Sequence, residues 1–72
     1  MTFDEASSVF YDPLAASGAD PDHSEDEERM VTFGMSSSGR LLVVAHTQRE
    51  EGIRIVRARP ATLRERILYE EG

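Results

Sequence analysis

The sequence predicts an α+β protein in which a three-stranded antiparallel β-meander lies between an N-terminal and a C-terminal helix. Three observations support this prediction. Two segments begin with a capping box and carry apolar residues at helical spacing. The three strand-like runs between them are separated by short turns that end in glycine. The chain has 72 residues, which allows one domain spanning residues 1–72 with only a thin core.

The N-terminal helix is expected over residues 3–10. Thr2 and Glu5 have the spacing of a capping box, in which each side chain bonds the backbone N–H of the other residue. The helix would place four apolar residues on one side, namely Phe3, Ala6, Val9 and Phe10. It ends at Asp12, because a residue that precedes proline avoids the helical conformation.

An acidic loop is expected over residues 14–28. Residues 17–22 have the glycine, proline, serine and aspartate composition that is typical of turns, and residues 24–28 are nearly all acidic. Such a loop is long for so small a domain, and long loops are often functional or mobile.

Three strands are expected, over residues 29–35, 40–47 and 53–59. The second strand is apolar on both faces, which predicts a central position in the sheet. In the third strand, simple alternation places Ile55 on one face and Val56 and Ala58 on the other. Gly39 and Gly52 close the two connections, at positions where a left-handed backbone is usual.

The C-terminal helix is expected from residue 62 to about Glu71. Thr62 and Glu65 form a second capping box, and Pro60 ends the strand before it. Its narrow apolar stripe consists of Leu63, Ile67 and Leu68. Because a helix of about ten residues is marginal on its own, we expect it to dock on the sheet.

The composition excludes several classes of protein. There is no cysteine, so neither a disulfide framework nor a thiolate zinc site is possible. The longest aliphatic run, residues 41–45, is far shorter than the roughly 20 residues that span a bilayer. The acidic N-terminus is not a secretory signal. A cytoplasmic protein without membrane contact is therefore expected.

The charges are unevenly distributed along the chain. The net charge is −6, but residues 1–28 carry nine acids and no base, whereas residues 29–72 carry eight bases and five acids. All eight bases are arginine, whose planar fork binds phosphate through two hydrogen bonds. Arg57 and Arg59 lie two apart on the third strand and therefore share a face. Together with the arginines at the end of the second strand and on the last helix, they would bind phosphates. The alternative is that they pair with the acidic residues and give a neutral surface.

Other motifs lack the residues that their chemistry needs. Residues 34–40 are similar to a phosphate-binding P-loop, but Arg40 replaces the lysine and a strand follows, so a hairpin turn is expected. Residues 20–26 begin like a calcium loop without its glycine, and a solvated acidic loop without a metal is expected. His46 is expected to be a half-buried structural residue, with a general acid or base as the alternative.

An ordered set of short segments carries a resemblance to a known family. The segments are Phe3–Ala6, Val9–Leu14, Asp22–Glu25, Glu27–Arg29, Gly34, Gly39–Val44, Thr47, Arg49, Arg54–Arg59, Thr62, Glu65, Arg66 and Tyr69. In this order they resemble the BrnT toxin family over nearly the whole chain. The resemblance implies a RelE-like fold and the toxin of a type II toxin–antitoxin module, a ribonuclease that cleaves RNA and inhibits translation without a metal or cofactor.

The resemblance also implies partners and a site. The partners are a ribbon-helix-helix (BrnA-like) antitoxin and the RNA substrate, with operator DNA bound only through the antitoxin complex. Arg49, in a Thr-x-Arg element, and Arg59, in an Ala-Arg element, are candidates to clamp the transition state. The further catalytic candidates are His23, Arg66 and Tyr69, and the RNA-binding candidates are Arg54, Arg57 and Arg64.

The sequence departs from the family at its beginning. Family members usually start with a further strand and a helix that carries a Lys-His-Gly element, whereas this sequence starts at the segment that follows. An N-terminally truncated toxin with one open sheet edge is therefore expected. Two functions remain open: an RNA-cleaving toxin, or an inactive remnant that only binds an antitoxin or another protein chain. A third is an unrelated acidic interaction module.

Overall fold

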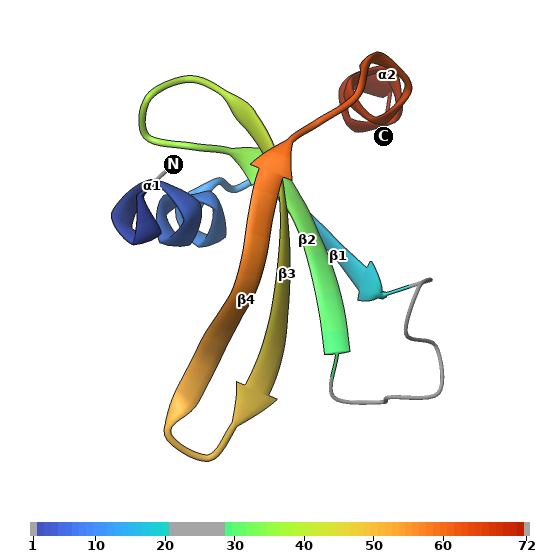
Figure 1. Cartoon of the computed structure of the whole chain (residues 1–72). Helices are drawn as coiled ribbons and strands as arrows, with labels where there is room; N and C mark the ends of the chain where they lie inside the picture. The colour runs from blue at the N-terminus through green and yellow to red at the C-terminus, as the bar shows by residue number, and fades with distance from the viewer. Residues whose placement is uncertain (1, 21–28, 72) are drawn as a thin grey trace.

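The computed structural model describes residues 2–20 and 29–71 (Figure 1). Its elements are α1 (Phe3–Ser8), the 3₁₀-helix η1 (Val9–Tyr11), β1 (Ala16–Ala19), β2 (Arg29–Met35), β3 (Leu41–Arg49), β4 (Gly52–Pro60) and α2 (Leu63–Glu71). The predicted α+β class is confirmed. The expected three-stranded sheet is wrong, because the sheet has four antiparallel strands in the order β1-β2-β3-β4.

The additional strand, β1, lies in the segment that was expected to be a loop. Its four residues pair with β2, from Ala16 opposite Phe33 to Ala19 opposite Met30. Pairing with a neighbouring strand overrides the weak strand propensity of serine and glycine in this segment. Residues 21–28, which hold most of the expected acidic loop, lie outside the described residues.

The predicted meander is confirmed in β2, β3 and β4. β3 lies between the other two strands, as its two apolar faces predict. The β2–β3 connection is a hairpin turn rather than a phosphate-binding loop. Both closing glycines adopt positive φ, +80° at Gly39 and +125° at Gly52, which is a conformation that favours glycine.

A β-bulge changes the alternation of β4. Ala45 pairs with Arg57 but the next residue of β3, His46, pairs with Ile55, so Val56 is the extra residue. Ile55 and Ala58 consequently both pack against the core cluster. Simple alternation had placed them on opposite faces, and that prediction was wrong because it assumed an unbroken strand.

The core lies between one face of the sheet and the helical segment α1–η1. Ala6 and Val9 pack there against Leu42 and Val44, and all four side chains are buried. Phe10 adds a partly buried ring, as predicted. Phe3, which was expected on the same side, is 66% exposed and does not belong to the core cluster.

The first capping box is realised only in part. The Thr2 hydroxyl accepts a hydrogen bond from the Glu5 backbone N–H at 3.1 Å. The Glu5 carboxylate is turned to the β2–β3 connection, where it accepts hydrogen bonds from Arg40 Nε at 2.9 Å, from the Ser36 hydroxyl at 2.8 Å and from Ser38. Hydrogen bonding to Arg40, and then to the two serines, lowers the pKa of Glu5 to about 2.

The C-terminal helix α2 begins with the predicted capping box. Thr62 and Glu65 exchange their hydrogen bonds at 3.2 and 2.9 Å. The expectation that α2 packs its apolar stripe on the sheet was wrong, because no residue of α2 is buried and the stripe is 45–74% exposed. The helix lies beyond the end of β4, on the side of the sheet away from α1 (Figure 1).

Candidate functional site

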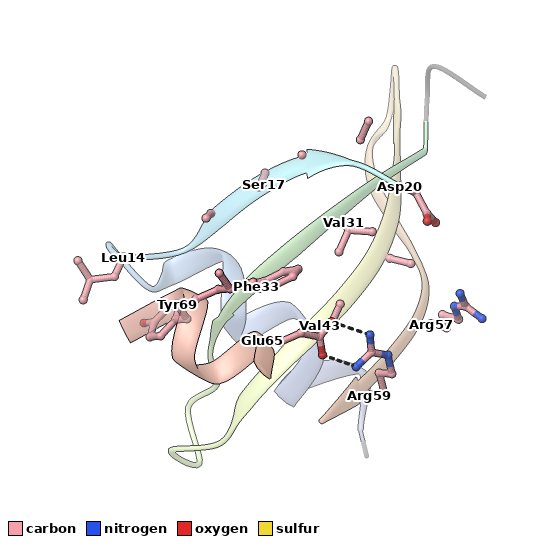
Figure 2. Close-up of a pocket in the computed structure, with 15 residues that line it drawn as sticks. Leu14, Ser17, Asp20, Val31, Phe33, Val43, Arg57, Arg59, Glu65 and Tyr69 are labelled. Atoms are coloured by element: carbon pink, nitrogen blue, oxygen red, sulfur yellow. Dashed lines mark hydrogen bonds and ion pairs between the residues drawn. The ribbon is translucent and has the colours of Figure 1, made fainter. Parts of the chain in front are cut away.

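The sheet face opposite α1 carries a hollow of about 440 Å³ that α2 borders at one end (Figure 2). Four apolar side chains of β2 and β3 lie among its lining residues: Val31, Phe33, Val43 and Ala45. They face this side because side chains alternate along a strand, and Leu42 and Val44 face the core. Leu68 and Tyr69 of α2 also line the hollow.

Two of the predicted arginines lie together at this hollow. Arg57 and Arg59 both line it, which confirms that they share a face of β4. The bulge extends this row, because Arg54 pairs with Thr47 two residues beyond the partner of Arg57. Without the extra residue, Arg54 would lie on the core face. The bulge thus gives β4 a row of three arginines on the face that carries the hollow.

Arg59 forms a two-pronged ion pair with Glu65 of α2. Arg59 Nη1 lies 2.7 Å from Glu65 Oε1, and Nη2 lies 2.8 Å from Oε2 (Figure 2). Nη1 also donates to the carbonyl of Pro60 at 3.2 Å. The Arg59 hydrogen bonds are the main cause that lowers the pKa of Glu65 to about 2. Glu65 is therefore an anion over the whole physiological range.

Tyr69 is bound to the chain segment before β1. Its hydroxyl donates to Asp12 Oδ2 at 2.5 Å, and Asp12 also accepts from the backbone N–H groups of Met35 and Leu14. The hydrogen bond from Tyr69, and then the backbone hydrogen bonds, lower the pKa of Asp12, while the same hydrogen bond raises the pKa of Tyr69. Tyr69 is thus a neutral donor that connects α2 to the rest of the fold.

His46 lies on the core face, away from the arginines. It is 6% exposed, its ring meets Phe10 edge-on at 4.9 Å, and Nε2 lies 2.7 Å from the Thr32 hydroxyl. Burial lowers its pKa, so the neutral imidazole is favoured near pH 7. These contacts support the structural interpretation of His46. The other histidine, His23, lies outside the described residues.

The remaining described candidates belong to β3 and α2. Arg49 is the last residue of β3 and pairs with Gly52. Arg64 and Arg66 are exposed on α2 but do not line the hollow, and Arg66 Nε lies 3.4 Å from Glu70. Among the described residues, no group of three or more histidine, aspartate or glutamate side chains is placed to hold a metal ion.

The alternative expectation, that the arginines pair with acidic residues, holds for some of them. Within the described residues, Arg40 pairs with Glu5 of the acidic N-terminal part, and Arg59 and Arg66 pair with Glu65 and Glu70 of the C-terminal part. From the sequence, Glu65 was expected to be a helix cap and Asp12 the end of a helix, and neither residue was placed in the site. The available signal was the capping box itself, which places the Glu65 carboxylate at the first turn of α2, six residues after Arg59.

Together, the fold and this face define a small α+β protein with an arginine-bearing hollow between its sheet and its last helix. Residues 1–65 match the family model described as "Ribonuclease toxin, BrnT, of type II toxin-antitoxin system". The chain belongs to this family, which confirms the resemblance drawn from its sequence. A comparison with curated proteins gave no match.

Membership of the family fixes the broad function. The family comprises ribonuclease toxins of type II toxin–antitoxin systems, which implies an antitoxin as partner. None of the helices in the described part of the chain has the length and apolar character needed to cross a membrane.

Proposed function

We propose that this chain is a metal-independent endoribonuclease toxin that cleaves RNA and thereby inhibits translation, and that it acts as one RelE-like domain in the cytoplasm. The observation that carries the proposal is the row Arg54, Arg57 and Arg59 on the face that carries the hollow, in a chain of this family. A ribbon-helix-helix, BrnA-like antitoxin would neutralise it, and operator DNA would be bound only by that complex.

The proposed chemistry is attack of a ribose 2′-hydroxyl on the adjacent phosphorus. The P–O5′ bond breaks, the 2′-hydroxyl loses a proton to a base, and the leaving 5′-oxygen gains one. Arg59 and Arg49 would stabilise the charge on the phosphorane, and His23, Arg66 and Tyr69 are the proposed proton-transfer or anchoring groups. Arg54, Arg57 and Arg64 would hold neighbouring phosphates.

A specific observation also supports the alternative of an inactive remnant that only binds its antitoxin. Three of the proposed catalytic residues are engaged inside the chain: Arg59 with Glu65, Arg66 with Glu70, and Tyr69 with Asp12. In a protein without catalysis, the contacts of Arg59 and Tyr69 would serve only to hold α2 in place.

RNA cleavage by the purified chain in EDTA tests the proposal. The wild type is compared with the double variant Arg49→Ala, Arg59→Ala and with Arg59→Lys, which keeps the charge but removes the planar fork. We expect the wild type to cut, and the double variant to be slower by about 10²-fold or more, as for loss of a transition-state donor. Circular dichroism shows whether each variant is folded.

The outcomes separate the candidate functions. Cleavage that requires added Mg²⁺ would contradict metal independence, and equal cleavage by Arg59→Lys would contradict the role of the fork. A folded wild type that leaves RNA intact, but binds a ribbon-helix-helix antitoxin, would establish the inactive remnant.

A further inference from the structure

We infer that Glu65 is an internal competitor for the phosphate-binding edge of Arg59, so that this carboxylate weakens the binding of an RNA phosphate at Arg59. The inference rests on the proposed function, in which Arg59 binds phosphate. It adds a regulatory residue that belongs to α2 and that neither the family match nor the sequence pattern assigns.

The geometry of the pair supports competition. The two Glu65 oxygens contact Arg59 Nη1 and Nη2 at 2.7 and 2.8 Å, which is the parallel, two-pronged arrangement that a guanidinium also makes with phosphate. A phosphate that binds this edge of the guanidinium therefore replaces the carboxylate. Glu65 occupies the position that two phosphate oxygens would take.

The pair is accessible to such an exchange. The Arg59 side chain is 52% exposed and lies at the wall of the hollow, while Glu65 is 19% exposed. Exposed ion pairs of this kind are weak, because water and salt compete for both partners. An RNA phosphodiester carries the same single negative charge as the carboxylate that it replaces, so the exchange depends on a small difference in free energy, and removal of the carboxylate should be measurable.

Glu65 has a second contact that remains after exchange. Its Oε1 also accepts the backbone N–H of Thr62 at 2.9 Å, so the residue stays at the start of α2 whether or not it holds Arg59. Glutamine is equally accepted at this position of a capping box. Glu65→Gln therefore keeps the cap, but it places an amide N–H₂ against the arginine and breaks the two-pronged pair.

The first test uses inorganic phosphate and follows the side-chain Nε–H signal of Arg59 by NMR. We expect Glu65→Gln to bind phosphate at this arginine about two- to fivefold more tightly than the wild type, the range set by an exposed ion pair. Glu71→Gln is the matched control, because it removes the same charge from an exposed residue of the same helix. It should behave as the wild type does.

The second test repeats the comparison with a non-cleavable 2′-O-methyl oligoribonucleotide and adds the double variant Arg59→Ala, Glu65→Gln. Glu65→Gln should bind the oligonucleotide more tightly than Glu71→Gln, and this gain should vanish when Arg59 is absent. If circular dichroism shows that Glu65→Gln loses helix, Glu65→Asp replaces it in the comparison with Glu71→Gln. Aspartate keeps the charge, but its shorter side chain does not reach Arg59.

The outcomes distinguish this inference from the proposed function. Tighter phosphate binding by Glu65→Gln without any oligonucleotide binding would support competition at Arg59 and contradict an RNA substrate. Equal affinities of Glu65→Gln and Glu71→Gln for phosphate would overturn the competition. A gain that persists without Arg59 would also overturn it, since the carboxylate would then act through general charge alone.

Discussion

At the scale of single residues, a few polar side chains connect segments that are distant in the sequence. Glu5 joins α1 to the β2–β3 turn, Asp12 joins the segment before β1 to α2, and Glu65 joins α2 to β4. All three carboxylates have lowered pKa values, and hydrogen bonding is the main cause in each. The pH dependence of stability should therefore be dominated by a small number of contacts.

We expect Glu5→Gln to flatten the acid side of the stability curve. The pKa of Glu5 in the folded protein is about 2, below its ordinary value of 4.5, so the folded state favours the carboxylate. Its stabilisation is fully present above about pH 4.5 and is lost as the pH falls toward 2. Urea unfolding between pH 2 and 7 measures this, and Asp4→Asn, in the same helix, should leave the slope unchanged.

We expect Gly34→Ala to destabilise the protein by about 1–3 kcal/mol, as overpacking of a core does. A Cβ at Gly34 would lie 2.7 Å from Val9 Cγ1 and 3.1 Å from both the Val9 carbonyl oxygen and Ala15 Cβ. Gly18→Ala is the control, because nothing lies within 4 Å of its added Cβ. Thermal unfolding that shows similar midpoints for both variants would contradict the close approach of Val9 to β2.

At the scale of elements, a helix or strand could be predicted from the sequence where a local pattern determines its structure. The glycine turns and the apolar β3 have local causes, so the meander was predictable, as was the shared face of Arg57 and Arg59. β1 was not, because Ser17 and Gly18 form a strand only through pairing with β2. The bulge at Val56, which sets the face of Arg54, arises from pairing as well.

The position of α2 shows a second limit of local patterns. Its capping box correctly marked its start, but its apolar stripe suggested docking that does not occur. The reason is geometric: the strand continues to Pro60, and α2 follows beyond the end of the sheet. The ion pair of Arg59 with Glu65 follows from that placement. The capping box alone located Glu65 at the start of α2, but it did not show that the carboxylate meets Arg59.

We expect Tyr69→Phe to loosen α2 without unfolding the sheet. The helix buries no residue, so the hydrogen bond from Tyr69 to Asp12 is one of the few contacts that restrain it. Loss of one such bond should speed amide hydrogen exchange in α2 by about two- to tenfold. Tyr11→Phe makes the same change at a site that is 87% exposed, and it should leave exchange in α2 unaffected.

At the scale of the whole molecule, stability depends on a core of few side chains. Ala6, Val9, Leu42 and Val44 form its buried cluster, and the other face of the sheet is open to the hollow. A domain of this size has only about 3–5 kcal/mol of stability from its core. Truncation of a single core side chain should therefore be enough to unfold most of the protein.

We expect Leu42→Ala to cost about 2–5 kcal/mol and to leave the chain largely unfolded at 25 °C. Leu63→Ala removes the same atoms from a side chain that is 74% exposed, and it should change stability by less than about 0.5 kcal/mol. Circular dichroism with urea titration separates the two. If Leu42→Ala unfolds at the same urea concentration as Leu63→Ala, the core assignment is wrong.

The edge position of β4 also affects whether copies of the protein associate at high concentration. This nine-residue edge strand carries Arg54, Arg57 and Arg59 on one face. If the β4 strands of two copies paired antiparallel with Arg57 or Arg59 at the centre, the arginines of the two copies would face each other. Like charges in directly opposite positions are destabilising. An incoming strand that carries carboxylates meets no such penalty. The arginine row thus discriminates against growth of a continuous sheet from identical chains, a safeguard against aggregation that charged edge strands commonly provide.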